Sequence, residues 1–478
     1  MLVLGLVVGG ASGFFLGSAL QESAPPQGEV VEVVGKVPSW LRGSYLRNGP
    51  GVFQGSHLFD GLARLHRWDF SSDGTCRVSA RDLDSKAGTF YRKSKGKTLF
   101  NEFRTPIPLS RWPLSLAAGG MTDNACVSVA VSNKQTFACT ETVAGTYAID
   151  PHTLRSRQHS FSGDESGLVQ TAHALPIDRG DFVNVGTSFF PPRYNVFKLK
   201  DNFKKKEVIA SLRPHDSRLS WMHAFGSTRT KAILVEHPCV YDFTALLSTD
   251  GFLEWAPERG TYVHVVDLNS GESTKIKCSR NFFFFHCCNA YDDDDVDEIV
   301  MDVCAYDDTR IIDSLALDKM RDPASDIPES KILRLRIGRD RVKEEGPLND
   351  AGATGKFAEF CAINPAYARR PYRYVYTNAA PNRPTSAANG LAKTDVLEKR
   401  TTIFETENKY VVVGEPIFVP GGGPAEDDGV LLVVGHTQTD NHLLVLDAKT
   451  ARELARVHNP PIPYGFHGAW LPSSSGGL

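Results

Sequence analysis

The sequence predicts an all-β fold, and the choices open at this point are a barrel, a sandwich or a propeller. From Glu29 to the end, short apolar runs rich in Val, Ile and aromatic residues alternate with turns made of Gly, Pro, Asn and Asp, which is typical of strands. No shift in composition divides this stretch. A chain of 478 residues is also long enough to bury one large core, so we expect residues 29–478 to form a single domain.

The clearest expected strands are short and end at turn residues, and runs of this length favour strands over helices. In chain order they are Tyr262–Leu268, Ile299–Ala305, Tyr372–Tyr376, Tyr410–Val413, Val430–Val434 and Leu443–Leu446. Helical segments are few, and Ile311–Met320 is the best of them. The motifs of WD and kelch repeats are not periodic here, so repeats do not single out the propeller.

Residues 1–20 carry no charged side chain, and glycine recurs at every fourth position from Gly5 to Gly17. This is the small-residue pattern of packed membrane helices, and about 20 residues just span a bilayer. We expect a membrane anchor here, with a cleaved signal segment or a misassigned start as the alternatives. Residues 21–28 are polar and contain proline, which predicts a linker.

The overall charge and the cysteines exclude several classes of protein. A net charge of -3 argues against nucleic acid as a partner, because binding to phosphates needs a basic surface. The nine cysteines form no CxxC pair, which argues against a disulfide scaffold and against a zinc ribbon. We expect free, buried thiols in a reducing compartment.

Four of the fourteen histidines lie among apolar or aromatic residues and are candidates for a shared metal site: His173, His223, His286 and His467. Any one of them alone is best explained as a core histidine with a hydrogen-bond partner, and only their number favours a metal. The other histidines that we place lie beside turns or charges and are expected to be solvated or structural: His57, His66, His152, His159, His215, His436, His442 and His458.

Three glutamates have similar apolar surroundings: Glu141, Glu359 and Glu415. A metal-bound imidazole usually donates its far N–H to a carboxylate, so these glutamates suit the four histidines, although separate pairing with Arg or Lys is the alternative. From His173 the six positions His173, His223, His286, Glu359, Glu415 and His467 are 50, 63, 73, 56 and 52 residues apart. One position per blade of a seven-bladed propeller would give such spacing. Because these six positions are a selection from many residues, their spacing alone does not decide among a barrel, a sandwich and a propeller.

At these residues the sequence resembles the carotenoid cleavage oxygenase family, especially its animal branch. The resemblance extends from Pro38 to the end of the chain and rests on many linked motifs in the same order. The motifs include Leu46-Arg47-Asn48-Gly49-Pro50-Gly51, His57-Leu58-Phe59-Asp60-Gly61, Thr122-Asp123-Asn124, Thr140-Glu141-Thr142, Thr171-Ala172-His173, Met222-His223-Ala224-Phe225, Glu359-Phe360, Glu415-Pro416-Ile417-Phe418-Val419 and Gly465-Phe466-His467-Gly468.

The resemblance implies a seven-bladed β-propeller with helices and loops that cap the iron-containing face. It implies Fe(II) bound by the four histidines, with the three glutamates behind them and Thr140 beside an open coordination position. Four neutral imidazoles without a thiolate agree with Fe(II). The expected reaction is cleavage of one double bond of a carotenoid or apocarotenoid by dioxygen, which gives carbonyl products. A retinoid isomerohydrolase and a non-catalytic binding propeller are the alternatives.

Residues 103–121 correspond to the membrane-docking segment of this family and contain no cysteine. Here we expect membrane contact through the apolar residues Ile107, Leu109, Trp112 and Leu114, since Trp beside Arg suits an interface. A buried propeller loop is the alternative. The expected location is the cytosolic face of a membrane, reached peripherally or through an N-terminal anchor, with a secreted form left open.

Overall fold

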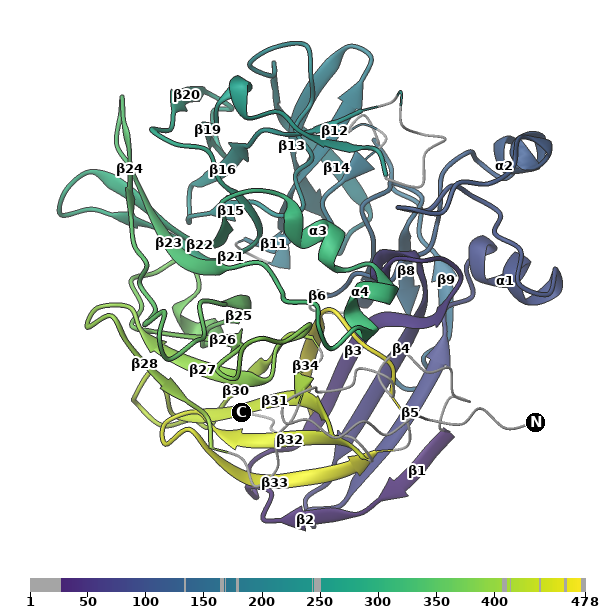
Figure 1. Cartoon of the computed structure of the whole chain (residues 1–478), viewed down its shortest axis with the longest axis vertical. Coiled ribbons are helices and arrows are strands. Elements are labelled where there is room, and N and C mark those ends of the chain that lie inside the picture. Colours follow the sequence, from purple (N-terminus) through teal and green to yellow (C-terminus); the bar gives the residue numbers. More distant parts are fainter. Residues whose placement is uncertain are drawn as a thin grey trace.

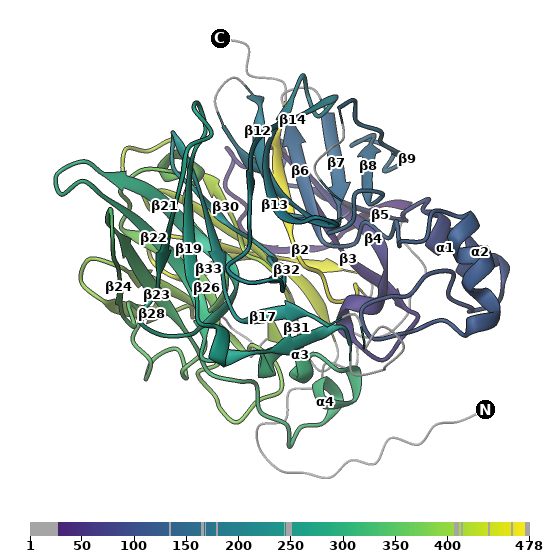
Figure 2. The ribbon, with the colours of Figure 1, turned by 90° about the horizontal axis from the view of Figure 1, so that it is seen from above.

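The protein is a seven-bladed β-propeller, in which seven antiparallel sheets surround a central axis (Figures 1 and 2). The computed structural model describes residues 27–473 except 133–134, 164–166, 168, 178–179, 243, 245–250, 406–410, 413, 438–439 and 460–461. Of the three all-β folds that the strand pattern leaves open, the structure has the propeller, as the family resemblance implies. The anchor expected at residues 1–20 lies outside the described residues.

The first three blades are built mainly from the N-terminal half of the chain. In sheet order, blade 1 contains β34 (Gly468–Pro472), β3 (Gly43–Phe53), β4 (Gly61–Phe70), β5 (Cys76–Asp82) and β1 (Gln27–Val31). Blade 2 contains β6 (Ser128–Ser132), β7 (Gln135–Cys139), β8 (Thr146–Ile149) and β9 (Ser156–Gln158). In blade 3, β10 (Val169–Gln170) and β11 (Leu175–Pro176) both pair with β12 (Phe182–Phe189), which β13 (Pro192–Lys200) and β14 (Lys205–Leu212) follow.

The other four blades follow in chain order. Blade 4 contains β15 (Gly226–Ser227), β16 (Lys231–Glu236), β19 (Tyr262–Asp267) and β20 (Ser273–Lys277). Blade 5 contains β21 (Phe283–Asp293), β22 (Glu298–Tyr306), β23 (Ser330–Ile337) and β24 (Val342–Glu345). Blade 6 contains β25 (Glu359–Ala362), β26 (Tyr374–Ala379), β27 (Gly390–Asp395) and β28 (Arg400–Ile403). In blade 7, β29 (Val411–Val412) and β30 (Ile417–Pro420) pair with β31 (Gly429–His436), which β32 (Asn441–Asp447), β33 (Arg452–Asn459) and β2 (Val33–Gly35) follow.

The ring is closed by strands from both ends of the chain. The C-terminal strand β34 pairs with β3, with Arg47 opposite Gly468, and the N-terminal strand β2 pairs with β33, with Val33 opposite Val457. Closure of this kind protects sheet edges that would otherwise stay unpaired. The pairing of β1 with β5 begins at Gln27, so the linker expected at residues 21–28 ends earlier than we predict.

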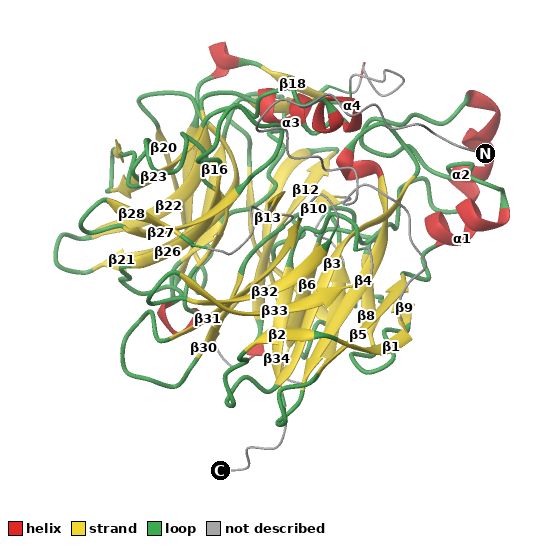
Figure 3. Cartoon of the chain, turned by 60° about the horizontal axis from the view of Figure 1, so that its bottom comes forward, coloured by secondary structure: helices red, strands yellow, loops and turns green. Residues whose placement is uncertain are grey.

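The few helices lie outside the sheets. Within the described residues they are α1 (Lys86–Lys93), α2 (Trp112–Ala117), α3 (Arg310–Ser314) and α4 (Leu317–Arg321), with short 3₁₀ turns η1 (Leu58–Asp60), η2 (Leu109–Arg111), η5 (Pro257–Arg259) and η6 (Pro365–Tyr367). Helices α3 and α4 and the two-stranded ribbon of β17 (Cys239–Tyr241) and β18 (Leu253–Trp255) lie over one end of the propeller, while α1 and α2 project at its side (Figures 2 and 3). None of the helices in the described part of the chain is long and apolar enough to cross a bilayer.

The predicted helix Ile311–Met320 is in fact two separate turns, α3 and α4. The backbone between them pairs with another segment, because Leu58 N–H donates to the Leu315 carbonyl and Leu317 N–H donates to the Ser56 carbonyl. These bonds replace helical ones, so the apolar period of the sequence does not produce one continuous helix.

Candidate metal centre

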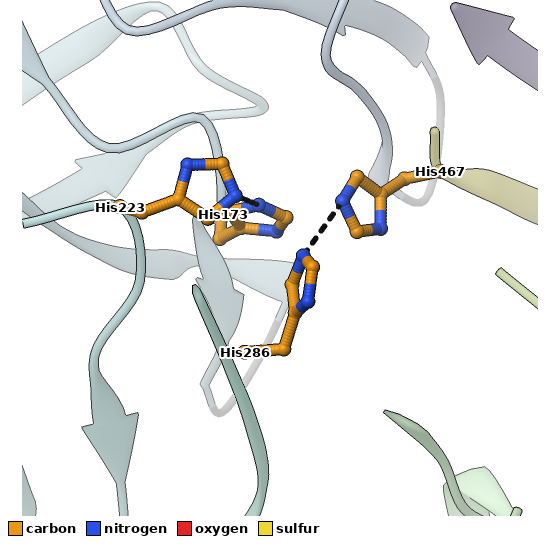
Figure 4. A group of neighbouring side chains, drawn as sticks. All are labelled: His173, His223, His286 and His467. Atoms are coloured by element: carbon orange, nitrogen blue, oxygen red, sulfur yellow. Dashed lines mark hydrogen bonds between the residues drawn. The ribbon is translucent and has the colours of Figure 1, made fainter. Parts of the chain in front are cut away.

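Four histidine side chains converge at the axis of the propeller: His173, His223, His286 and His467 (Figure 4). One ring nitrogen from each lies within 4.8 Å of the corresponding nitrogens of the other three. The Nε2 atoms of His173 and His223 are 3.1 Å apart, and so are those of His286 and His467. His173 is half-buried and the other three are buried.

Each histidine comes from the axial side of a different blade. His173 lies between β10 and β11 of blade 3, His223 precedes β15 of blade 4, and His467 directly precedes β34 of blade 1. His286 lies within β21 of blade 5, where the pairing register with β22 shifts between Phe284 and Cys287. Irregularities of this kind redirect side chains beside functional sites, and here the shift spans the histidine that reaches the axis.

The three remaining blades each contribute a glutamate behind the histidines. In blade 2, Glu141 Oε1 is 2.5 Å from His223 Nδ1, and in blade 6 the Glu359 carboxylate accepts from His286 Nδ1. In blade 7, Glu415 Oε2 is 3.4 Å from His467 Nδ1, a longer contact. Every blade of the propeller therefore places one of the seven predicted residues at this centre.

Other groups hold two of these carboxylates in place. Trp221 Nε1 donates to Glu141 Oε2 over 2.7 Å, and the backbone N–H of Phe360 donates to Glu359 Oε2 over 2.6 Å. Because the glutamates accept at Nδ1, the Nε2 atoms of His223 and His286 are left free to face the centre.

The environment favours neutral imidazoles at two of the four positions. Burial, and then the neighbouring histidines, hold the pKa of His173 and of His467 well below the usual value. Burial also acts to lower the pKa of His286, but the charge and the hydrogen bond of Glu359 outweigh it, so this pKa is raised. Burial raises the pKa of Glu415 to about 7.

This donor set fits a divalent transition metal. Neutral imidazole nitrogens bind Fe, Zn, Cu and Ni, and carboxylates at the far nitrogen orient such ligands and raise their basicity. Two nitrogens 3.1 Å apart subtend a right angle at an ion about 2.2 Å away, close to known metal–imidazole bond lengths. Four ligands on an octahedral ion would leave two positions open, unlike a closed tetrahedral structural site.

An apolar cavity of about 470 Å³ leads to this centre. Its lining includes His223, His286 and His467, and also the α2 residues Trp112 and Leu116. Its lining is mostly aromatic and aliphatic, with Phe59, Phe103, Phe189, Trp221, Tyr241, Phe252, Phe285, Tyr306, Phe357, Phe360, Tyr464 and Phe466 among its residues. Such a cavity suits a long apolar ligand rather than a polar one.

Thr140 lies on the wall of this cavity and is buried. Its backbone N–H donates to the carbonyl of Gly145. A Cβ atom added to Gly145 would lie 2.1 Å from Thr140 Cγ2, so the glycine provides the space that the threonine methyl occupies.

The expected membrane-contact residues divide into two groups. Leu109 and Leu114 are 69% and 48% exposed, and Leu116 beside them is 67% exposed. Ile107 is buried, at 4% exposure, and Trp112 is half-buried and lines the cavity. The prediction that Ile107 contacts a membrane is wrong, because its side chain packs inward along the cavity wall.

The structure also corrects the expectation for two other histidines. His436 and His442 are 0% and 2% exposed, because they lie within β31 and β32 of blade 7 rather than in the turns beside them. Sequence reasoning also missed His264, whose Nε2 is 2.7 Å from the buried carboxylate of Glu236. This pair lies in blade 4, and His264 is not part of the group of four at the axis.

Comparison with known proteins gives consistent matches over nearly the whole chain. A family described as "Retinal pigment epithelial membrane protein" matches residues 18–472. The chain is 32% identical to the chloroplastic carotenoid cleavage dioxygenase 8 homolog A of Oryza sativa, over 92% of this chain and 85% of that protein. It is 30% identical to the carotenoid isomerooxygenase of Galleria mellonella, over 96% of both. The likeness thus includes plant as well as animal proteins.

Solved structures agree with the fold. A mutant of Synechocystis apocarotenoid oxygenase superposes with a TM-score of 0.80 at 22% identity, over 95% of this chain and 98% of that chain. The cobalt-substituted form of the same enzyme gives a TM-score of 0.79 at the same identity and coverage.

Proposed function

Because the chain belongs to the family of the retinal pigment epithelial membrane protein and the carotenoid cleavage oxygenases, we propose that it is an iron(II)-dependent dioxygenase. Its substrate is a carotenoid or apocarotenoid, and its reaction adds the two atoms of O2 across one carbon–carbon double bond to give two carbonyl products. The observation that carries this proposal is the convergence of four histidines beside an apolar cavity, whose lining includes three of them.

The metal in this proposal is Fe(II). Imidazole ligands alone do not choose among first-row metals, but a site with open positions suits the binding of dioxygen beside an alkene. The Synechocystis apocarotenoid oxygenase, which has the same fold, exists in a cobalt-substituted form, and this supports a metal in the present protein. Bound at these histidines, Fe(II) supplies the electron transfer to dioxygen that cleavage of the double bond requires.

The residues of the chain position the reactants. Glu141 and Glu359 fix the ring orientation of His223 and His286 through Nδ1, so that Nε2 of each faces the axis. The aromatic walls hold an extended polyene and exclude water. Thr140, held between the cavity and Gly145, limits the space on one side of the centre and so helps to select which double bond lies there.

The test is product analysis of protein loaded with Fe(II) without oxygen and then given all-trans-β-carotene or an apocarotenoid under labelled dioxygen. The expected result is two carbonyl products that carry the label, after correction for exchange with water. Turnover that persists without oxygen and gives an isomerised alcohol would instead support the second candidate function, that of a retinoid isomerohydrolase. A chain that binds no metal and turns over nothing would instead be a binding propeller.

We also propose that the protein acts on its substrate at a membrane surface, because carotenoids are almost insoluble in water. The support is a group of exposed apolar side chains in η2 and α2: Leu109, Leu114 and Leu116. Leu116 also lines the cavity. Another exposed apolar side chain is that of Phe190, which is 93% exposed at the turn between β12 and β13. It directly follows the cavity residue Phe189. Exposed apolar groups beside a cavity mouth are typical of a contact surface.

A further inference from the structure

Three cysteines meet between blades 5 and 6: Cys288, Cys304 and Cys361. Their Sγ atoms all lie within 4.8 Å of one another, and those of Cys288 and Cys304 are 3.8 Å apart. The three residues are 8%, 0% and 9% exposed. The sequence separates them by up to 73 residues, so only the packing of the two blades brings them together.

The surroundings of this cysteine group are closed to solvent. Cys288 lies in β21, Cys304 in β22 and Cys361 in β25. The side chains packed with them include Val300, Ile332, Leu348, Ala358, Tyr372, Val375 and Val396. The other six cysteines are also free thiols, but none of them belongs to a comparable group of potential ligands in the described part of the chain.

The separations between the sulfur atoms match those of a thiolate metal site. A disulfide needs sulfurs about 2.0 Å apart, so the 3.8 Å contact joins two separate thiols. With metal–sulfur bonds of about 2.3 Å, sulfurs bound to one ion lie about 3.8 Å apart in tetrahedral geometry and about 4.0 Å apart in trigonal geometry. The observed group needs shifts of less than about 1 Å to reach either arrangement.

We propose that Cys288, Cys304 and Cys361 form a binding site for one thiophilic d¹⁰ cation, with Cu(I) as the ion that fits best. Soft thiolate ligands select Cu(I) and Zn(II) among the common metals. Structural zinc sites take four protein ligands, whereas no fourth histidine, cysteine or carboxylate joins this group among the described residues. Three sulfurs in an apolar pocket therefore favour three-coordinate Cu(I).

Binding of the ion releases thiol protons, because the thiolate is the ligand. The cation then compensates the thiolate charge that the core would otherwise disfavour. This site is distinct from the four histidines and does not depend on the reaction that we propose for them.

The cysteine group nevertheless lies close to the histidine centre along two strands. Cys288 is two residues from His286 on β21, and Cys361 is two residues from Glu359 on β25. Cys304 lies on β22, which carries no residue of the histidine centre. Substitution of Cys304 therefore tests the cysteine group with the least disturbance of that centre.

The experiment titrates Fe(II)-loaded protein with Cu(I) under argon in the presence of a competing Cu(I) chelator. We expect the wild type to take up one Cu(I) per chain with thiolate-to-copper absorption in the near ultraviolet, and Cys304→Ala to lose that uptake. Cys76→Ala is the matched control, since Cys76 is equally buried but lies in β5 of blade 1, and it should bind copper as the wild type does.

X-ray absorption at the copper edge gives a second readout on the wild type alone, should the Cys304 variant fold poorly. Three sulfur neighbours at about 2.3 Å would support the site. Uptake by Cys304→Ala equal to that of the wild type, or a copper environment made only of nitrogen, would overturn it. Iron content measured in parallel shows whether the histidine centre stays loaded, so failure of this proposal is distinguishable from failure of the proposed oxygenase.

Discussion

At the residue scale, the three glutamates differ in how closely they contact their histidines. Glu141 lies 2.5 Å from His223 and Glu359 hydrogen-bonds His286, whereas Glu415 is 3.4 Å from His467. The longer contact makes Glu415 the weakest of the three carboxylate partners.

The contacts predict graded effects of Glu→Gln substitution. Loss of a carboxylate partner typically lowers metal affinity or activity roughly 10–100-fold. We expect losses of that size for Glu141→Gln and Glu359→Gln and a smaller loss for Glu415→Gln at pH 7. The measurement is iron affinity together with turnover of each variant. Wild-type behaviour of the first two, or the largest loss at Glu415, would show that these contacts do not orient the ligands.

A substitution at the neighbouring Gly145 can displace the Thr140 side chain while Thr140 itself is kept. In Gly145→Ala the new Cβ would meet Thr140 Cγ2 at 2.1 Å, so the threonine must shift. A displacement of about 1 Å at a reacting centre can cost roughly 100-fold in rate, and we expect a loss of roughly 10–100-fold with unchanged iron content. Combination with Thr140→Ser removes the clashing methyl, so the double variant should lose less than the sum of the two single losses. If the loss in the double variant equals the sum of the two single losses, the Gly145 substitution does not act through Thr140.

The sequence analysis identified the residues at the axis, but it did not predict which glutamate contacts which histidine. The four histidines stand out because apolar neighbours surround each of them in the chain. Which glutamate serves which histidine depends on the order of blades around the ring, and neighbouring residues in the sequence do not encode it. His436 and His442 show the reverse difficulty, since turn residues near them suggested exposure although the strands that hold them are buried.

At the element scale, apolar periodicity identified strands well and helices poorly. Tyr262–Leu268, for example, is β19 with a boundary one residue shorter. The segment Ile311–Met320 has helical periodicity, yet pairing of Leu315 and Leu317 with residues 56–58 divides it. That pairing is a tertiary contact, which local sequence does not reveal.

The α2 segment yields a prediction about membrane binding. In a chain without residues 1–20, Leu109→Ser and Leu114→Ser together should release the protein from liposomes and slow turnover of substrate dissolved in them. Neither residue lines the cavity, so turnover of detergent-dispersed substrate and iron content should stay near the wild-type values. The control is Leu397→Ser, because Leu397 is 62% exposed in the turn between β27 and β28 of blade 6. Failure of the truncated wild-type chain to bind liposomes would refute docking through this segment.

At the scale of the whole molecule, the ring explains why the seven residues at the centre are so far apart in sequence. Each blade supplies one of them, and strands from both chain ends close the ring. The sequence alone supports an all-β chain, and the seven blades follow from the family resemblance. Blade number depends on twist and packing between sheets, which no single strand pattern determines. The cysteine group between blades 5 and 6 was hidden for the same reason.

The most direct test of the metal centre is the amount of iron that each chain retains after anaerobic loading with Fe(II) and removal of unbound metal. We predict one iron per chain for the wild type and a large loss in His286→Ala and His467→Ala. His436→Ala should retain one iron, since His436 is equally buried but lies in β31. Full iron occupancy in His286→Ala or His467→Ala would contradict the assignment of these residues as ligands.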